Sequence, residues 1–134
     1  MKLLIDSSVY ISLMGKKDIY SSPSEKFMLT LEEDGGEVIM PSLVAAEIVS
    51  VLAKQKTGNL SAVTQYLFDF GIVSLDESIL REMLKISLKS VLALKTSDLV
   101  IAVTARITDA TLITWDKKLL KYAPEICRVQ SPKI

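Results

Sequence analysis

Residues 96–116, TSDLVIAVTARITDATLITWD, contain a helix followed closely by a strand, and this unit decides the fold class. Thr96 or Ser97 is expected to cap the helix, which runs to about Ile107. Thr111–Thr114 is a short run rich in apolar residues, which is typical of a strand buried on both faces. A helix that leads into such a strand is the repeating unit of a parallel sheet.

The same alternation of short strands and helices extends over the rest of the chain. Glycine and proline residues separate the segments, as expected where helices and strands end. We therefore predict an α/β fold of three layers, with a central, mainly parallel sheet of four to five strands and helices on both faces. The strands are expected at Lys2–Ile5, Val38–Met40, Ile72–Leu75 and Thr111–Thr114, with an edge strand at Cys127–Val129. The other helices are expected at Val9–Met14, Pro23–Asp34, Ser42–Lys56, Leu60–Phe70, Asp76–Ser90 and Lys117–Tyr122, with Ser22, Ser42 and Asp76 as caps.

Length and composition indicate one globular domain, residues 1–134, without a charge-driven affinity for nucleic acid. Of the 134 residues, 49% are apolar and 24% are charged, which excludes intrinsic disorder. Sixteen basic and sixteen acidic residues cancel, so bulk positive charge cannot be the means of binding RNA or DNA. The single cysteine, Cys127, suits a reducing cytoplasm. The most apolar later run, Leu99–Ala105, is too short to span a membrane.

The absence of histidine narrows the possible chemistry. It excludes Ser-His-Asp and Cys-His nucleophilic sites, histidine general bases and histidine-bound zinc. One cysteine likewise cannot form a cysteine-rich metal cluster. Any ionic chemistry must therefore depend on carboxylates, hydroxyls, lysines or a bound metal.

Four acidic residues that are far apart in the sequence are expected at the same edge of the sheet. Asp6 immediately follows the first strand, and Asp116 comes two residues after the fourth. Glu47 lies early in the helix after the second strand, and Asp98 begins the helix that leads into the fourth. Because the carboxyl ends of parallel strands and the starts of the following helices share one edge, these side chains should meet in one ligand-binding pocket.

A cluster of four carboxylates persists only if protons or cations neutralise it. Two unit charges about 4 Å apart repel each other by roughly 4 kcal/mol at an effective dielectric constant near 20. Mg²⁺ or Mn²⁺ would relieve this repulsion, since hard divalent ions prefer carboxylate and water oxygens. A metal held in this way can bind a phosphate oxygen, lower the pKa of a water molecule and stabilise the leaving oxygen. The residues therefore predict metal-dependent phosphodiester hydrolysis.

Each acid alone also has an ordinary structural explanation. Asp98 could favour a helix N-terminus through the helix dipole, and Asp6 or Asp116 could be loop caps. Glu47 differs from these three because its neighbours on both sides are apolar. A buried, unpaired glutamate is costly, so its position favours a metal or a charged partner.

Four blocks of sequence around these acids carry a resemblance to a known family. They read LLIDSS at 3–8, PSLVAAE at 41–47, TSDLVIAVTA at 96–105 and LITWD at 112–116. In order and spacing they resemble the PIN domain, over essentially the whole chain. The size and layout are similar to the VapC toxins, the ribonuclease components of VapBC toxin–antitoxin pairs.

The resemblance implies a PIN-like fold and an endoribonuclease that depends on Mg²⁺ or Mn²⁺. It also implies a homodimer and a VapB-like antitoxin whose tail covers the active-site groove. By the family pattern, the catalytic and metal-binding residues are Asp6, Glu47, Asp98 and Asp116, with Asp6 and Asp98 as direct ligands and the hydroxyls of Ser8 and Thr114 in support.

Two segments depart from the family pattern. Thr108-Asp109-Ala110 replaces a turn that usually contains glycine, and Lys117-Lys118-Leu119 stands where some members place another acid or asparagine. The second departure concerns a second metal position and leaves the first unaffected.

Several side chains near the predicted site have two interpretations. Lys117, Lys118 and Lys121 could contact RNA phosphates, but charge runs are usually solvated helix faces, and we interpret them so. Trp115 and Tyr10 could stack on bases, but we interpret both as packing residues.

Two helices could serve partners. Leu60–Phe70 could offer a groove to an antitoxin helix. The apolar positions of Asp76–Ser90 belong either to the core or to a dimer surface.

Two other functional classes remain open. A PIN-like RNA-processing or non-catalytic RNA-binding or scaffold protein without an antitoxin would keep the fold, although the presence of all four acids disfavours a non-catalytic one. A receiver-type phosphorylation domain also gathers acids at this edge. That class requires an adjacent acidic pair after the first strand and a phosphoacceptor aspartate after the third, and Ser7-Ser8 and Leu75-Asp76 fit this pattern poorly.

Overall fold

A sheet of parallel strands forms the centre of the fold in the computed structural model, which describes residues 1–56 and 58–133. The strand order is β3-β2-β1-β4-β5, so the strand nearest the N-terminus is the central one. Leu4 of this strand pairs with Ile39 on one side and with Leu112 on the other. The predicted α/β fold with a parallel sheet is therefore confirmed. The strands are β1 (Lys2–Ile5), β2 (Glu37–Pro41), β3 (Ile72–Val73), β4 (Thr111–Ile113) and β5 (Val129–Gln130).

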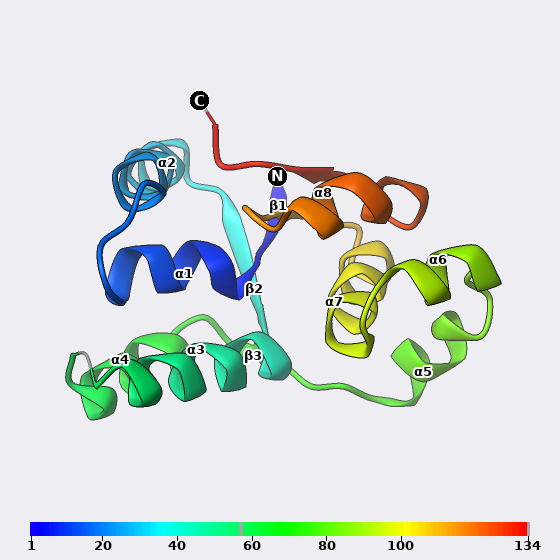
Figure 1. Cartoon of the computed structure of the whole chain (residues 1–134), viewed down its shortest axis with the longest axis horizontal. Helices are drawn as coiled ribbons and strands as arrows, with labels where there is room; N and C mark the ends of the chain where they lie inside the picture. The colour runs from blue at the N-terminus through cyan, green and yellow to red at the C-terminus, as the bar shows by residue number, and fades with distance from the viewer. Residues whose placement is uncertain (57, 134) are drawn as a thin grey trace.

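Helices cover both sides of this sheet. Figure 1 shows α1 and α2 on one side of the strands and α7 on the other. Along the described residues, none of the helices combines the length and the apolar character needed to cross a membrane. The helices are α1 (Ser7–Met14), α2 (Ser21–Asp34), α3 (Ser42–Gln55), α4 (Leu60–Phe68), α5 (Glu77–Met83), α6 (Leu88–Ala93), α7 (Thr96–Ile107) and α8 (Lys117–Tyr122), followed by a 3₁₀ turn, η1 (Ala123–Glu125).

The hydrophobic core lies around β1 and α7. Leu4 and Ile5 are fully buried because strands pair with β1 on both sides and helices cover the sheet. Residues 99–105 of α7 are all buried, as expected for a helix that is apolar around its whole circumference. The strand β1 ends at the carboxyl edge of the sheet, and α7 begins there. The core therefore fixes the backbone next to Asp6, which follows β1, and at Asp98, in the first turn of α7.

The predicted helix Asp76–Ser90 is two helices, α5 and α6. Asp76 caps α5 as predicted, since its side chain accepts a hydrogen bond from the Ile79 backbone N–H at 3.2 Å. The backbone N–H of Ile86 bonds to the carbonyl of Met83, a tight turn that ends the helix. Ser87 then has an extended backbone, and its hydroxyl caps α6. This cap explains the break, because a serine in an extended conformation starts a new helix.

The other predicted caps were wrong by one or two residues. The helix α2 begins at Ser21 with Tyr20 in the N-cap position, so the predicted cap at Ser22 does not form. Ser42 is the first residue of α3, not its cap, because Pro41 has the extended backbone that precedes the helix. Likewise Lys95, and neither Thr96 nor Ser97, occupies the N-cap position of α7.

Candidate active site

Asp6 lies buried at the carboxyl end of β1, where α1 begins. Its backbone N–H donates to the carbonyl oxygen of Ile113 at 2.9 Å, which ties it to the end of β4. The residue occupies the N-cap position of α1, yet its carboxylate makes no capping hydrogen bond, and it is only 4% exposed. The capping explanation therefore does not apply to Asp6.

Two hydroxyls hold one oxygen of the Asp6 carboxylate. Ser8 Oγ donates to Asp6 Oδ2 at 3.0 Å, and Thr114 Oγ1 donates to the same oxygen at 2.8 Å. Backbone N–H groups fix both hydroxyls. The N–H of Trp115 donates to Ser8 Oγ at 3.1 Å, and the N–H of Asp116 donates to Thr114 Oγ1 at 2.9 Å. Among the described residues, the other oxygen, Oδ1, receives only a long contact of 3.5 Å from the adjacent serine. This arrangement orients Asp6 and leaves Oδ1 without a short hydrogen bond from those residues.

Asp98 lies in the first turn of α7 and is only 6% exposed. Burial, together with the negative charges of Asp116 and Asp6, raises its pKa to about 6, while Lys95 and Lys118 act in the opposite direction. Asp98 is thus within electrostatic reach of two acids from other segments. A carboxyl group with this pKa is partly protonated near neutral pH unless a cation compensates its charge.

Glu47 projects from α3 and is half-buried. Its Oε1 atom is buried and has no hydrogen-bond partner among residues 1–56 and 58–133. Burial raises the pKa of Glu47, as do the charges of Asp6 and Asp98, against the effect of Lys95. Buried polar atoms in proteins almost always have a partner, so this oxygen is a position where a cation or a proton donor would bind.

Asp116 has a structural role as well as a place near the site. As predicted for a cap, its Oδ1 accepts hydrogen bonds from the backbone N–H groups of Lys118 at 2.9 Å and Leu119 at 3.0 Å, at the start of α8. Its charge still reaches Asp98 and raises the pKa of that residue. One carboxylate oxygen thus caps the helix, while the charge of the same group acts on Asp98.

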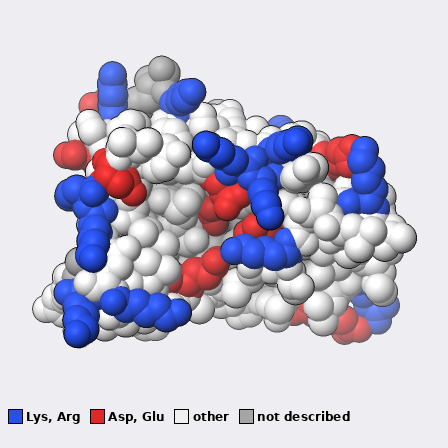
Figure 2. Space-filling view, viewed as in Figure 1, with Lys and Arg blue, Asp and Glu red and all other residues white. Residues whose placement is uncertain are grey.

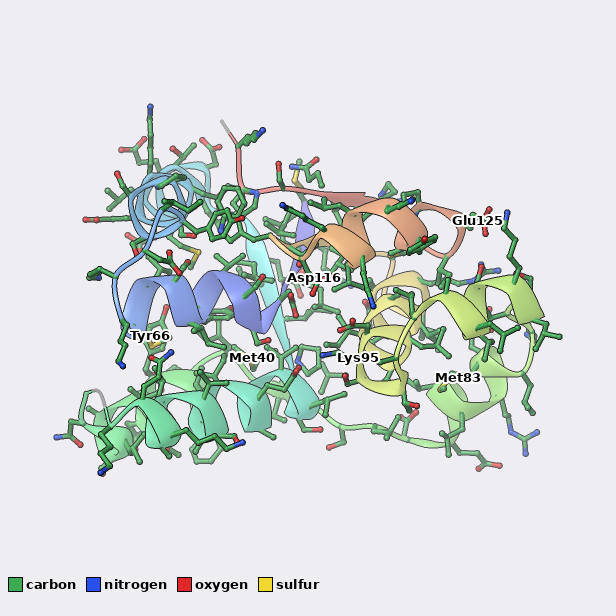
Figure 3. The ribbon with its side chains drawn as sticks, in the orientation of Figure 1. Met40, Tyr66, Met83, Lys95, Asp116 and Glu125 are labelled. Carbon is green, nitrogen blue, oxygen red and sulfur yellow. The ribbon has the colours of Figure 1, made fainter. Side chains whose placement is uncertain are left out.

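We refer to Asp6, Glu47, Asp98 and Asp116 together as the acidic site. On the face of the molecule drawn in Figure 2, acidic side chains are gathered at the centre and basic side chains lie around them. Figure 3 shows Asp116 and Lys95 on opposite sides of this central region. Across residues 1–56 and 58–133, no three His, Cys, Asp or Glu side chains are arranged as a ready-made ligand set. The chemistry of the donors nevertheless fits a hard divalent cation, because all are oxygens and one of them is buried without a partner.

Lys95 could not be recognised from the sequence as a residue of the site. It is not part of any of the four blocks that carry the family resemblance, and the sequence shows only that it lies three residues before Asp98. In the structure its charge acts on both Glu47 and Asp98, so it belongs to the surroundings of the acidic site.

The aromatic residues near the site are packing residues, in agreement with our interpretation of the sequence. Trp115 Nε1 donates to Ser24 Oγ at 2.7 Å, and the indole ring stacks on Tyr20 with ring centroids 4.7 Å apart. Tyr10 is fully buried and packs edge-to-face on Phe70. Trp115 thereby connects α2 to the segment after β4. The backbone N–H of this segment that bonds to Ser8 is thus held in place.

The sequence profile of the PIN domain family matches residues 3–124. The chain belongs to the PIN domain family. No curated protein matches this PIN domain. Its structure is similar to those of VapBC2 from Rickettsia felis bound to a promoter DNA fragment (TM-score 0.69, 18% identity, 98% of each chain covered) and of a toxin–antitoxin complex from Klebsiella pneumoniae (TM-score 0.73, 20% identity, 98% of this chain and 99% of the other). It is also similar to FitAcB from Neisseria gonorrhoeae (TM-score 0.71, 20% identity, 98% of each chain).

Proposed function

We propose that this PIN domain, residues 1–134, is a metal-dependent endoribonuclease and the toxin of a VapBC-type pair. The observation that carries the proposal is the buried Asp6, oriented by two hydroxyls beside Glu47 and Asp98, whose pKa values burial raises. Carboxylates gathered in this way are costly without a cation, and perturbed pKa values are frequent at catalytic sites. Membership of the PIN family and the likeness in fold to toxin–antitoxin complexes support the proposal.

The acidic site fits Mg²⁺ or Mn²⁺, which Asp6 and Asp98 would hold directly with Glu47 and Asp116 completing the site. When bound, such an ion polarises the scissile phosphate and lowers the pKa of a water molecule. Ser8 and Thr114 hold Oδ2 of Asp6, so that Oδ1 keeps one orientation as the substrate arrives. Burial makes Glu47 a stronger base than an exposed glutamate, and its unpartnered Oε1 can take the proton of the attacking water.

The test is RNA cleavage in Mg²⁺ or Mn²⁺ by variants that differ by one carboxylate. Asp6→Asn and Asp98→Asn should each lose at least about 100-fold in cleavage rate, because each removes a negative charge at the reacting centre. Asp109→Asn is the matched control: Asp109 lies at the other end of β4, and asparagine tolerates its positive φ of 55°. Undiminished cleavage by both site variants would contradict the site. RNA binding without cleavage by the wild type would instead favour a non-catalytic RNA-binding module.

An antitoxin is the protein partner we propose. The structural neighbours are complexes of toxins with antitoxins, and the predicted groove-forming helix α4 leaves Tyr66 and Phe68 exposed by 41% and 60%. The decisive observation is the neighbouring reading frame. A short frame that encodes a DNA-binding fold, and whose product suppresses the nuclease, would identify a toxin, whereas its absence would favour an RNA-processing enzyme. The reducing cytoplasm expected from the single cysteine stays a prediction.

We propose that a second copy of the chain covers α5 and α6. Four leucines of α5, α6 and the turn between them are exposed, and exposed apolar surface of this extent often marks an interface. A variant with Leu84→Ser and Leu88→Ser should be monomeric by light scattering, whereas the wild type should be a dimer. Leu29→Ser, at a leucine of α2 that is 55% exposed, is the control and should leave the dimer intact. A monomeric wild type at tens of micromolar would refute this surface. The exposed fractions are 52% for Leu80, 87% for Leu84, 71% for Leu88 and 77% for Leu92.

The receiver-type alternative is not supported by the structure. The aspartate after β3, Asp76, is used as the cap of α5, where its Oδ1 also accepts a hydrogen bond from Ser78. The strand β3 lies at the edge of the sheet, away from Asp6 on the central strand. A phosphoacceptor there would be separated from the other acids.

A further inference from the structure

Two lysine side chains, Lys95 and Lys118, border the acidic site without an ion-pair partner. Both are exposed, and no carboxylate oxygen lies within 4.0 Å of either ammonium group in the part of the chain that the structure describes. Lys95 nevertheless acts on the pKa of both Glu47 and Asp98, and Lys118 acts on that of Asp98. Their positions in the fold agree with these effects: Lys95 immediately precedes α7, whose first turn contains Asp98, and faces Asp116 in Figure 3, while the backbone N–H of Lys118 donates to Asp116 Oδ1 at 2.9 Å.

Helix stability does not explain Lys95. The residue occupies the N-cap position of α7, a helix of 12 residues, and its side chain makes no capping hydrogen bond. The positive end of the helix dipole disfavours a cation at this position, and serine, threonine, asparagine or aspartate would cap the helix better. The position of this lysine is therefore explained by the acidic site, not by the helix that it precedes.

The balance of charge leaves the lysines available for a ligand. Four carboxylates and one divalent cation would together carry two negative charges, which repel an RNA backbone. The two ammonium groups offset these charges. Because neither of them forms an ion pair with a carboxylate of the described residues, both can contact a phosphate that approaches the site.

We propose that Lys95 and Lys118 position the RNA by binding the phosphates that flank the scissile one. This inference rests on the proposed nuclease function and extends it to the substrate backbone. It replaces our interpretation of Lys118 as part of a solvated helix face. Both lysines are positioning residues, since neither is required to touch the reacting atoms. They also explain how a chain without net charge can bind RNA, because the positive charge is local.

A matched control lies on the same helix as Lys118. Lys121 is exposed as well, but it lies 5.3 Å from the centre of the Tyr122 ring and lines a separate hollow with Lys89 and Ser90 of α6. Replacing Lys121 by alanine removes the same charge from α8 without changing the border of the acidic site. Any effect of Lys118→Ala that Lys121→Ala lacks is therefore local to the site.

The experiment measures the affinity of the full chain for a labelled single-stranded RNA of mixed sequence as a function of salt. All variants carry Asp6→Asn to prevent cleavage, and Mg²⁺ is present throughout. Lys95→Ala and Lys118→Ala should each make the plot of log K against log salt shallower by about 0.7, the value for one phosphate contact on a single strand. Lys121→Ala should leave the slope unchanged, and Lys95→Arg and Lys118→Arg should restore it.

Kinetics with an active Asp6 separate positioning from structure. Lys95→Ala and Lys118→Ala should raise KM several-fold and change kcat little, and arginine should rescue KM. Unchanged salt slopes and KM in both alanine variants, with the wild type binding and cleaving RNA, would overturn this inference alone. A wild type that neither binds nor cleaves RNA would overturn the proposed function together with the inference.

Discussion

The two edges of the sheet arrange charged residues in opposite ways. At the carboxyl edge, Asp6, Glu47 and Asp98 come from three segments, and burial raises the pKa of the last two. At the amino edge, Arg128 forms an ion pair with Asp109 at 3.0 Å, so that opposite charges are matched. The carboxyl edge therefore stores unfavourable electrostatic energy, whereas the amino edge does not.

A hollow of about 610 Å³ lies at the amino edge. It is lined by residues that include Arg106, Asp109 and Arg128, and all three are engaged in ion pairs. The acidic site instead has the buried Oε1 of Glu47, which has no hydrogen-bond partner among the described residues. Groups with perturbed pKa values are frequent at catalytic sites, so this difference supports the carboxyl edge as the place of the chemistry that we propose.

The largest expected effect in this comparison concerns Thr114. Thr114→Val removes the hydroxyl that donates to Asp6 Oδ2 while keeping the shape of the side chain. We expect about a 10- to 100-fold loss of affinity for Mn²⁺, since the partners that orient metal ligands have effects of this size. A Mn²⁺ titration measures it. Thr111→Val, at the opposite end of β4, is the control, and equal losses in both variants would contradict a specific role for Thr114.

The next effect concerns the stability of the metal-free protein. Because the pKa of Asp98 is about 6 when folded and near 3.8 when unfolded, the folded state binds the proton more tightly. Stability should therefore fall as the pH rises from about 4 to 6, and Asp98→Asn should lack this part of the decline. At pH 7 we expect the variant to be more stable by about 1 kcal/mol.

Thermal unfolding in EDTA between pH 4 and 7.5 measures this difference. Addition of Mg²⁺ at pH 7.5 should raise the melting temperature of the wild type more than that of Asp98→Asn. A difference between the two proteins that does not vary with pH would show that Asp98 ionises without cost.

The smallest effect is expected at the amino edge. Arg128→Ala breaks the ion pair with Asp109, whose two side chains are 62% and 87% exposed. Exposed pairs contribute little because water screens them, so the free energy of unfolding should change by less than about 1 kcal/mol. Urea unfolding measures it, and cleavage of RNA should not change. A loss larger than that of any carboxyl-edge variant would reverse the comparison.

The alternation of short apolar runs and helices along the chain was sufficient to predict the α/β fold. The strand predicted at Lys2–Ile5 and the helix predicted to end at about Ile107 were both confirmed. The break between α5 and α6 was missed because the apolar period continues through it, and only the extended backbone of Ser87 reveals it.

The acidic site was predicted in part. The expectation that Asp6, Glu47, Asp98 and Asp116 meet at one edge agrees with their mutual effects on pKa, while their catalytic roles stay a prediction. The sequence could not tell that Asp116 caps a helix and Asp6 does not, since both precede helices in the same way.

The order of apolar and acidic segments along the chain determined by itself that this protein forms a parallel sheet with carboxylates at one edge, because burial and the handedness of the connections admit few other arrangements. Only the tertiary structure decided which oxygens are held, which are left without a partner, and which lysines stand beside them. Those properties depend on distances between side chains from separate segments, and such distances exist only after the chain has folded.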